Sequence, residues 1–401
     1  MKTYIGVNNL SKEAKKIYIG YNNKALELPI TTPPAPPYRV MTAKFNLSDS
    51  NPATWGSYED DAVGMVAGSA DWDAFFGHYP CILENGVELG KLNPNNMAQY
   101  EDGTSAPITT LGKDVMICFP RRGLKIWTDS GYLYVSMTDT EGVEGYTYYA
   151  HTYKGNACDK FYLGKYKGYV SSSALYSTSG QTPTASQTIG TFRTQAQARG
   201  TGYEQSAFYQ LTYRQAMYML KYLGANAQIA VGRGFVDSNS AAHVTGGTNA
   251  LGMDYGENTG NVQCSLFGLE DFWGNVWEFI DGIYCNSSRQ LSATDGNYND
   301  TGSGYTTISS ATASSDWNKY LRYPVGTSEG GFAPLVSNTN GGSDSTYFCD
   351  GANAYADRLA SFGGRWNEVS YAGVFPLCVN RSASYSTAYV GSRLMYMHVV
   401  S

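Results

Sequence analysis

Residues 362–397 read FGGRWNEVSYAGVFPLCVNRSASYSTAYVGSRLMYM, and two kinds of position alternate in this stretch. One kind has structural character: Gly363, Gly364, Trp366, Ala372, Gly373, Gly391 and Arg393. Between them stand side chains of mixed chemistry: Val369, Tyr371, Pro376, Cys378, Arg381, Tyr385, Thr387 and Tyr389. The last three are two residues apart, so in an extended chain they lie on one side. The pattern fits either a recognition surface on a rigid frame or an ordinary C-terminal strand and loop.

The composition favours many short strands and long ordered loops. A chain of 401 residues can form one large domain or about two to three small ones. It contains 45 Gly and 34 Tyr, and only 15% of its residues are charged, which argues against a coiled coil and against disorder. Tyr provides stiff contact surface in antibody paratopes and also fills half-buried sheet positions, and we expect both uses here.

Charge and cysteine usage exclude further classes. The net charge of −6 and the lack of a basic stripe argue against nucleic-acid binding. Seven cysteines lie far apart without a CxxC pair, which favours free thiols over a disulfide framework or a zinc site. The N-terminus lacks the apolar run of a signal peptide, and no stretch approaches the length of a membrane span. We therefore expect a chain made in a cytoplasm and not inserted in a membrane.

Three segments are expected along the chain. Residues 1–30 contain an internal echo, YIGVNN at 4–9 and YIGYNN at 18–23, and each reads as a brief strand followed by an Asn turn. Such pieces cannot build a core alone, so this β segment is either a docking element for another protein or a tail. TTPPAPP at 31–37 is a stiff proline-rich linker, and residues 38–401 form the main domain.

Inside the main domain, three β-rich runs and one helix are the clearest elements. The runs 114–120, 124–128 and 132–138 are separated by turn residues and predict a meander. A helix is predicted over 213–223, where Thr212 and Gln215 form a capping box and Gly224 ends the helix. Apolar residues of this segment recur at helical spacing, which indicates a core helix.

The most distinctive string is FGLEDFWGNVWEFIDGIY, residues 267–284. We expect Trp273 and Trp277 to be buried around a turn at Gly274 and Asn275. Four acidic residues surround this turn and could bind Ca²⁺, although bonding to backbone amides is the simpler interpretation: Glu270, Asp271, Glu278 and Asp281. The four histidines are scattered and no metal, phosphate or serine-nucleophile motif is present, so no cofactor or metal site is predicted.

These two stretches resemble a known group. GLEDFWGNVWEF (268–279) resembles the GLxDxxGNVWEW string of the C-type lectin fold of the formylglycine-generating-enzyme type. Residues 363–394 resemble the variable region of the target proteins of diversity-generating retroelements. The resemblance covers residues 38–401 and is most specific in the last third. It implies an α+β C-type lectin fold with short strands, long ordered loops and few helices, and a variable ligand-binding region at about 363–393.

The resemblance also implies how the variable positions arise. In this group a reverse transcriptase miscopies adenines of a template repeat, so that Asn codons become almost any NNY codon. All eight mixed positions named above can arise in this way, whereas Glu368 cannot. The structural positions of the family's variable region match this sequence at Trp366, Gly373, Gly391 and Arg393. Ser392 stands where the family usually has Phe. We expect Trp366 to be a buried aromatic residue of this frame.

The enzyme branch of the same fold uses two cysteines near its C-terminus to bind copper. Here the corresponding region, 380–394, has none, and Cys378 stands alone before it. No catalytic residue is therefore carried over, and the protein is expected not to be an enzyme. The EPN and QPD motifs of calcium-dependent lectins are also absent, which argues against sugar binding through calcium.

Together these observations favour a phage or prophage receptor-binding protein of the virion tail. Tyr371, Tyr385 and Tyr389 would be aromatic anchors and Arg381 a charged contact to a bacterial surface receptor, protein or glycan. The N-terminal segment would bind other tail proteins, and by analogy with fibre tips the chain would form a homotrimer. Two alternatives stay open: a structural tail or baseplate subunit without a diversified site, and an oxidase of the formylglycine-generating type.

Overall fold

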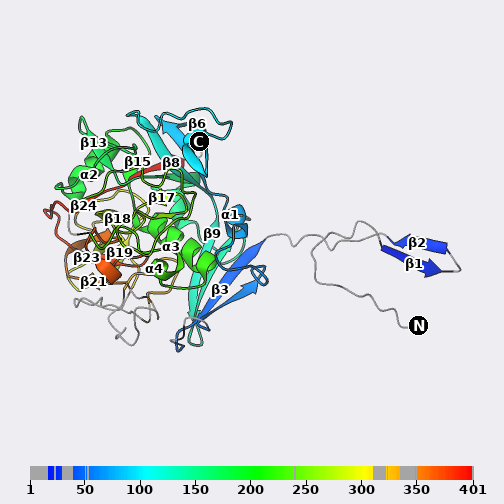
Figure 1. The fold of residues 1–401 in the computed structure, drawn as a ribbon. Coiled ribbons are helices and arrows are strands. Elements are labelled where there is room, and N and C mark those ends of the chain that lie inside the picture. The colour runs from blue at the N-terminus through cyan, green and yellow to red at the C-terminus, as the bar shows by residue number, and fades with distance from the viewer. Residues whose placement is uncertain are drawn as a thin grey trace. The chain divides into compact units, whose positions relative to one another are not determined.

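A computed structural model describes residues 17–21, 24–28, 39–49, 51, 54–238, 241–309, 322, 324–334, 348 and 350–399. The chain divides into two units, Met1–Arg39 and Val40–Ser401. The described part consists mostly of β structure, with four α-helices and two 3₁₀ turns (Figure 1). None of the helices in that part has the length and apolar character needed to cross a membrane. The linker predicted at 31–37 lies outside the described residues.

In the first unit the described residues form one antiparallel hairpin. β1 (Ile17–Tyr21) pairs with β2 (Lys24–Leu28), and the register places Tyr21 opposite Lys24. The second copy of the echo, 18–23, thus begins as a strand, as predicted. The first copy at 4–9 lies outside the described residues.

The second unit begins with a four-stranded antiparallel sheet in the order β4-β3-β10-β9. Its strands are β3 (Val40–Asn46), β4 (Gly56–Asp60), β9 (Gly123–Asp129) and β10 (Tyr132–Thr138). Ser130 and Gly131 join β9 to β10 with φ angles of 50° and 84°, which is the backbone that a two-residue hairpin turn requires. Across this hairpin the rings of Trp127 and Tyr134 stack with centroids 4.7 Å apart.

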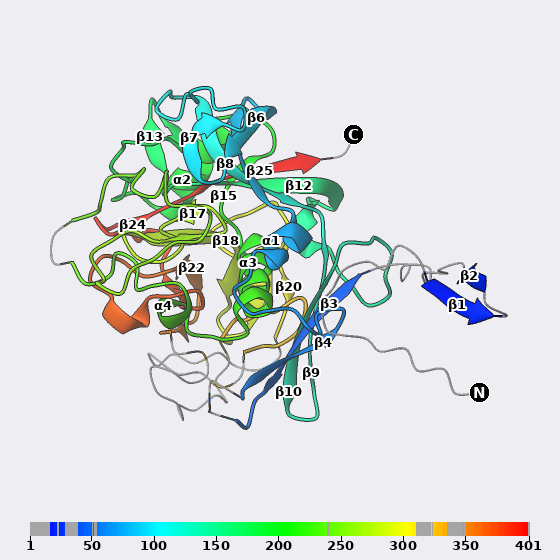
Figure 2. The ribbon, with the colours of Figure 1, turned by 45° about the vertical axis from the view of Figure 1, so that its right-hand side comes forward.

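The largest sheet has eight strands, seven of them in the order β15-β25-β12-β8-β5-β6-β7, with β11 paired to β12. They are β5 (Tyr79–Glu84), β6 (Val87–Asn93), β7 (Asn96–Tyr100), β8 (Lys113–Pro120), β11 (Thr152–Tyr153), β12 (Asn156–Gly164), β15 (Tyr203–Gln205) and β25 (Leu394–Val399). The C-terminal strand β25 therefore lies inside this sheet, between β15 and β12 (Figure 2). Pairing on both edges holds β25, the strand that directly follows the predicted variable region, in place within the sheet.

A seven-stranded sheet carries the two stretches singled out in the sequence. Its order is β20-β19-β18-β22-β23-β21, and β24 pairs in parallel with β18. The strands are β18 (Trp277–Cys285), β19 (Leu291–Ala293), β20 (Thr306–Thr307), β21 (Asn353–Ala354), β22 (Arg358–Phe362), β23 (Leu377–Arg381) and β24 (Val390–Gly391). Two small hairpins complete the β structure: β13 (Tyr169–Ser171) with β14 (Ala174–Tyr176), and β16 (Ser265–Leu266) with β17 (Leu269–Glu270).

One long helix runs through the interior. The helical elements are α1 (Asp71–Phe76), α2 (Ile189–Gln197), α3 (Phe208–Tyr222), α4 (Ala227–Ala230), η1 (Tyr149–His151) and η2 (Val369–Tyr371). α3 packs between β3 and β10 of the four-stranded sheet and β18 of the seven-stranded sheet (Figure 2). Two of its buried polar side chains bond to backbone carbonyls: Gln210 donates to Ala150 O and Gln215 donates to Val374 O. Such pairing is what buried polar groups require.

Two predictions about these elements were wrong. The three β-rich runs are strands, but they do not form a meander, because β8 belongs to the eight-stranded sheet while β9 and β10 belong to another. All but the end residues of β8 are buried, so this strand suits an interior place between β5 and β12. The helix begins at Phe208 rather than 213, so Thr212 lies within it and is not a cap. Leu223, not Gly224, adopts the left-handed conformation at its end (φ 51°).

Candidate ligand-binding surface

The aromatic turn predicted at Gly274 and Asn275 is present and tightly held. Trp273 is fully buried and Trp277 is 2% exposed. Gly274 has a φ of 80°, and a Cβ atom there would lie 2.7 Å from Phe235 O, so both conformation and space require glycine. Asn275 also has a positive φ (63°), and its amide donates to Asp271 Oδ2 at 2.7 Å. The turn is therefore held in one conformation, and the neighbouring segments pack against it.

The simpler interpretation, bonding to backbone amides, holds for Glu270, whereas Asp271 accepts from side-chain amides. Glu270 accepts from the backbone N–H groups of Gly246 and Thr248, at 2.7 and 2.8 Å. Asp271 accepts from Gln263 Nε2 at 2.6 Å, and burial together with the adjacent Glu270 raises the pKa of Asp271 to about 6. Among the described residues, no group of three or more His, Cys, Asp or Glu side chains is arranged to hold a metal ion.

Arg393 ties the end of the predicted variable region to the same turn. Its side chain is fully buried and donates to Glu278 Oε2 at 2.8 Å. Its other nitrogens donate to four backbone carbonyls, those of Gly164, Lys165, Glu270 and Asp271. Lys167 Nζ also lies 3.1 Å from Glu278 Oε2. Arg393 thus joins β12, the aromatic turn and the C-terminal strand at one buried point.

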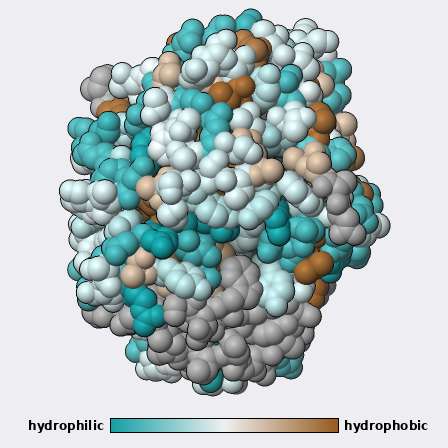
Figure 3. All heavy atoms as spheres, turned by 90° about the vertical axis from the view of Figure 1, so that its left-hand side faces the viewer, coloured by the Kyte–Doolittle hydropathy of each residue, from teal (hydrophilic) through white to brown (hydrophobic). Residues whose placement is uncertain are grey.

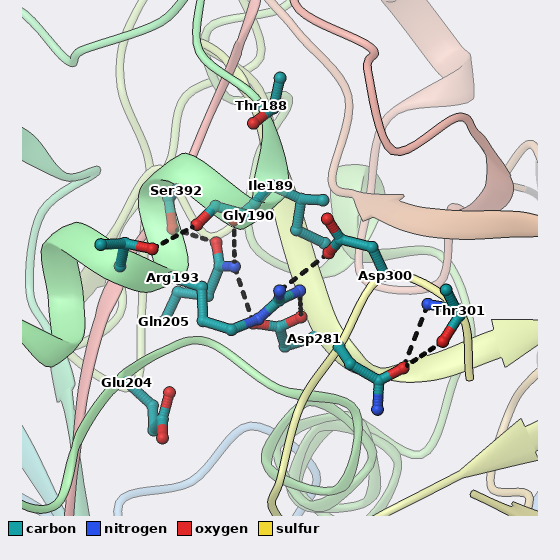
Figure 4. A network of polar contacts seen from close by, with 12 residues as sticks. Thr188, Ile189, Gly190, Arg193, Glu204, Gln205, Asp281, Asp300, Thr301 and Ser392 are labelled. Atoms are coloured by element: carbon teal, nitrogen blue, oxygen red, sulfur yellow. Dashed lines mark hydrogen bonds and ion pairs between the residues drawn. The ribbon is translucent and has the colours of Figure 1, made fainter. Parts of the chain in front are cut away.

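A second buried network holds Ser392, the residue that stands where the family usually has Phe (Figure 4). Ser392 Oγ donates to Gln205 Oε1 at 2.9 Å, and Gln205 Nε2 donates to Asp281 Oδ2 at 2.7 Å. Arg193 of α2 makes a bidentate pair with Asp281 at 2.6 and 2.9 Å and reaches Asp300 at 2.8 Å. A serine hydroxyl fits this polar interior, so the departure from the family pattern has a local reason.

Two glycines of the predicted frame are buried at close approaches of the chain. A Cβ atom on Gly373 would meet the carboxylate of Asp350 at 2.2 Å. A Cβ atom on Gly391 would meet Thr184 O at 2.7 Å. Both positions therefore exclude any larger residue without movement of their neighbours.

On this frame, Arg381, Tyr385 and Tyr389 form one connected, half-buried group. Arg381 Nη1 donates to Tyr385 Oη at 3.0 Å, and the two tyrosine hydroxyls lie 3.0 Å apart. Burial raises the pKa of Tyr385, while the hydrogen bond from Tyr385 lowers the pKa of Tyr389. The two rings pack with one face against the core, which leaves the remainder accessible.

Arg365 and Glu368 extend this group, and sequence reasoning missed both. Arg365 lies over the ring of Tyr389 at 4.1 Å, and its Nε is 3.2 Å from Glu368 Oε2. Glu368 Oε2 also accepts from Trp277 Nε1 at 3.1 Å, which links the surface to the floor formed by that indole. In the sequence, the spacing of three residues between Arg365 and Glu368 was the one feature that could have indicated this ion pair. We call Arg365, Glu368, Arg381, Tyr385 and Tyr389 the Arg–Tyr surface.

Val369 and Tyr371 lie in η2, which packs against another element. Gln228 of α4 donates to the carbonyls of Val369 and Ala372, both at 2.8 Å. Val369 is 43% exposed and has a φ of 49°, a conformation that β-branched residues rarely adopt. Tyr371 is half-buried. These two predicted contact residues are accessible, but the Arg–Tyr surface does not include them.

Several predicted positions are not outward-facing. Cys378 is 0% exposed and Pro376 is buried, so neither offers its side chain to a ligand. Cys378 lies in β23, and its side chain is buried because it packs into a cluster that includes Trp277, Leu359 and Val390. Thr387 Oγ1 is buried, and Thr387 O accepts from Ser186 N at 2.9 Å, so this residue belongs to the support.

Trp366 was expected to be a buried member of the frame, and this is wrong because its side chain is only partly buried. Its backbone N–H donates to Asn275 O at 3.0 Å, and its carbonyl accepts from Ser238 N at 2.7 Å. The backbone of Trp366, rather than its ring, thus connects the predicted variable region to the aromatic turn. The buried aromatic support comes from Trp273 and Trp277 instead.

The face of the molecule on the side of β24 is mostly hydrophilic to neutral, with only scattered hydrophobic residues (Figure 3). No broad apolar patch is visible there among the described residues. A ligand on this side would therefore be recognised mainly by tyrosine, guanidinium and other polar groups, as in antibody paratopes.

Comparisons with known proteins give weak structural similarity alone. No family model matches the sequence, and no curated protein matches it. Among solved structures, the Major Tropism Determinant P3c variant is similar with a TM-score of 0.29 and 12% identity, covering 84% of this chain and 74% of that chain. The U1 variant has a TM-score of 0.25 and 13% identity, covering 86% and 89%. At these TM-scores the similarity carries no argument, so the function is argued from the residues.

Proposed function

We propose that this protein is a phage or prophage receptor-binding protein with a C-type lectin fold of the formylglycine-generating-enzyme type. The observation that carries the proposal is the Arg–Tyr surface, a connected, half-buried group mounted on a largely buried frame. Tyr and Arg are the residues most often found at the energetic centres of protein interfaces. Arg381 forms no ion pair with a carboxylate among the described residues, so its charge is available to a ligand.

The proposed mechanism is contact rather than catalysis. Cys378, the one cysteine near the site, is buried, and burial raises the pKa of its thiol to about 12. A buried thiol that stays protonated at neutral pH is a poor nucleophile. An oxidase that uses paired thiolates near the chain end is therefore disfavoured.

Further parts of the proposal concern assembly. The N-terminal hairpin β1–β2 would dock on other tail proteins, since a two-stranded piece needs a partner to be stable. Many copies on one virion, as homotrimers by analogy with fibre tips, would compensate for weak single contacts. Avidity of this kind raises apparent affinity by roughly 10²–10⁴.

The proposed diversification offers a physical explanation for the backbone at Val369. If this position derives from an Asn codon, its φ of 49° suits the ancestral residue, because Asn tolerates the left-handed region and Val does not. Val369→Asn is expected to raise the free energy of unfolding by about 1 kcal/mol, the strain that the left-handed conformation imposes on other residues. Chemical denaturation of the full chain measures this change.

Val369→Ala is the matched control for that substitution. It removes the β-branch but keeps a Cβ atom without a side-chain amide, so a smaller gain is expected. The hydrogen bonds of Val369 are made by its backbone N–H and carbonyl, and both variants keep them. A lower stability for the asparagine variant than for the native chain would contradict the explanation.

The receptor-binding proposal is tested by adsorption of the purified, fluorescently labelled full chain to a panel of bacterial strains. Saturable adsorption to a subset of strains is expected, because a specific surface ligand differs between strains. Equal adsorption to every strain, or to none of a broad panel, would contradict the proposal.

In related genomes, sibling sequences should differ at Arg381, Tyr385 and Tyr389, and a near-copy of this stretch should lie beside a reverse-transcriptase gene. Invariance at these positions would favour a structural tail subunit.

A further inference from the structure

A cavity lies among elements that do not contribute to the Arg–Tyr surface. Its volume is about 940 Å³, within the range of small-molecule sites. It is formed by α1, the start of β5, the end of β6, the end of α3 and the loop 251–256. Part of its wall is apolar, formed by Pro80, Leu92, Val231 and Met253.

The polar part of the wall carries more negative than positive charge. Asp73, Glu101 and Asp254 contribute three carboxylates, and Lys221 contributes one ammonium group, which leaves an excess of two negative charges. Lys221 Nζ lies 2.6 Å from Asp73 Oδ1 and 2.5 Å from Asp254 Oδ2. The imidazole of His78 adds no charge, because burial lowers its pKa to about 4.

The three carboxylates differ in how many of their hydrogen-bond acceptor positions are still unoccupied. Asp254 accepts from Lys221, Tyr222 Oη and Phe267 N, so most of its acceptor positions are used by hydrogen bonds within the protein. Asp73 accepts only from Lys221 among the described residues, and its side chain is 32% exposed. A carboxylate offers about four acceptor positions, so capacity is left on Asp73. Glu101 is exposed at the rim, and no described residue pairs with its carboxylate.

His78 gives an independent indication that a polar ligand belongs here. It is 8% exposed and lines the cavity, and neither ring nitrogen has a hydrogen-bond partner. Its Nε2 lies 3.9 Å from Asp73 Oδ1, while its ring stacks on Phe119. A buried polar group without a hydrogen-bond partner is destabilising, and native proteins rarely contain one unless a water or a ligand supplies the missing partner.

We propose that this cavity binds a small organic cation, a primary ammonium group carried on a short apolar chain. Asp73 and Glu101 accept from the ammonium group, since they hold the free acceptor capacity and the excess charge. His78 contributes a neutral polar contact beside Asp73. The apolar wall takes the methylene chain, which makes the site selective for an amine with an aliphatic stem over an inorganic cation.

The test uses Nα-acetyl-lysine N-methylamide as the probe and the norleucine analogue as its matched uncharged control. The full chain is labelled with ¹³C at methionine methyl groups, and Met253→Leu assigns the reporter resonance in the cavity wall. Titration with the lysine probe is expected to shift the Met253 signal to saturation and to leave Met137, buried in β10, unchanged. The norleucine analogue should bind at least about tenfold more weakly, since it lacks the charge.

Two carboxamide variants locate the contact. Asp73→Asn keeps the shape of the residue, and Lys221 keeps its pair with Asp254, while Glu101→Gln changes only an exposed side chain. Each is expected to weaken binding of the lysine probe at least about fivefold. The Tyr385→Ala variant should bind it normally, so failure here is distinct from failure of the receptor-binding proposal. Equal binding of both probes, no shift of Met253, or native affinity in both carboxamide variants would overturn the assignment.

Discussion

Replacing Tyr385 and Tyr389 together by alanine is expected to reduce adsorption to a susceptible bacterial strain by more than about 100-fold. Each tyrosine at the centre of an interface can contribute about 2 kcal/mol or more, and about 1.4 kcal/mol corresponds to a tenfold change in affinity. The double substitution also removes the hydroxyl that Arg381 bonds and the ring beneath Arg365. Four contact groups of the Arg–Tyr surface are therefore disturbed at once.

The double variant should remain folded. Both tyrosines are only half-buried, so their loss removes packing at the edge of the core and not in its centre. A decrease of only a few degrees in Tm is therefore expected. If Tm fell as far as it does for a core variant, the loss of adsorption would report unfolding and the assignment of the surface would fail.

Two controls separate contact from general surface damage. Tyr134→Ala removes a half-buried tyrosine from the four-stranded sheet, where it stacks on Trp127, and should leave adsorption unchanged. Tyr385→Phe with Tyr389→Phe keeps both rings and removes both hydroxyls. Intermediate adsorption is expected for this pair, because the aromatic faces remain while the hydrogen bond from Arg381 is lost.

The elements that sequence reasoning located correctly are those defined by local chemistry. The run 114–120 is apolar from Val115 onward and becomes the buried strand β8. The turn at Gly274 follows from a glycine and an asparagine between two tryptophans, and both residues have positive φ. In each case neighbouring residues alone fix the conformation, so the sequence pattern is sufficient.

The predicted face of Tyr385, Thr387 and Tyr389 shows the expected alternation, but the three residues lie on the half-buried side. Ser386 and Ala388 between them are exposed, and the two tyrosine hydroxyls lie 3.0 Å apart. Turns at 383–384 and 388–389 bend this segment. Spacing of two residues groups side chains on one side, but which side faces solvent depends on the elements packed against the segment, and that information is not local.

Burial of Cys378 and the roles of Arg365 and Glu368 were also outside the reach of a pattern. Cys378 is buried because its side chain packs into a cluster with Trp277, which lies far away in the sequence, and with Leu359 and Val390. Glu368 was set aside because its codon does not fit the variable set, but the structure gives it the indole of Trp277 as a partner 91 residues away. Contacts over such separations follow from the fold and not from spacing.

Glu278→Gln is expected to cause the largest loss of stability in the domain, about 3–5 kcal/mol. Glu278 is fully buried, with Arg393 at 2.8 Å, Lys167 at 3.1 Å and Arg214 at 4.0 Å. An amide in its place leaves three buried cations without their counter-charge. For a domain of this size the loss corresponds to a decrease in Tm on the order of 10 °C, measured by calorimetry of the full chain. Glu59→Gln is the control, since its exposed pair with Lys44 should contribute about 1 kcal/mol or less.

The pH dependence distinguishes loss of charge from loss of packing. Burial alone would raise the pKa of Glu278, but Arg393, Lys167 and Arg214 together lower it well below its usual value. A carboxylate with a lowered folded-state pKa stabilises the protein above its unfolded pKa of about 4.3, and this contribution is lost as the pH falls further. The glutamine variant has no such contribution to lose. The difference in stability between the two chains should therefore be constant near neutral pH and narrow below about pH 4, whereas a packing defect would keep it the same at both.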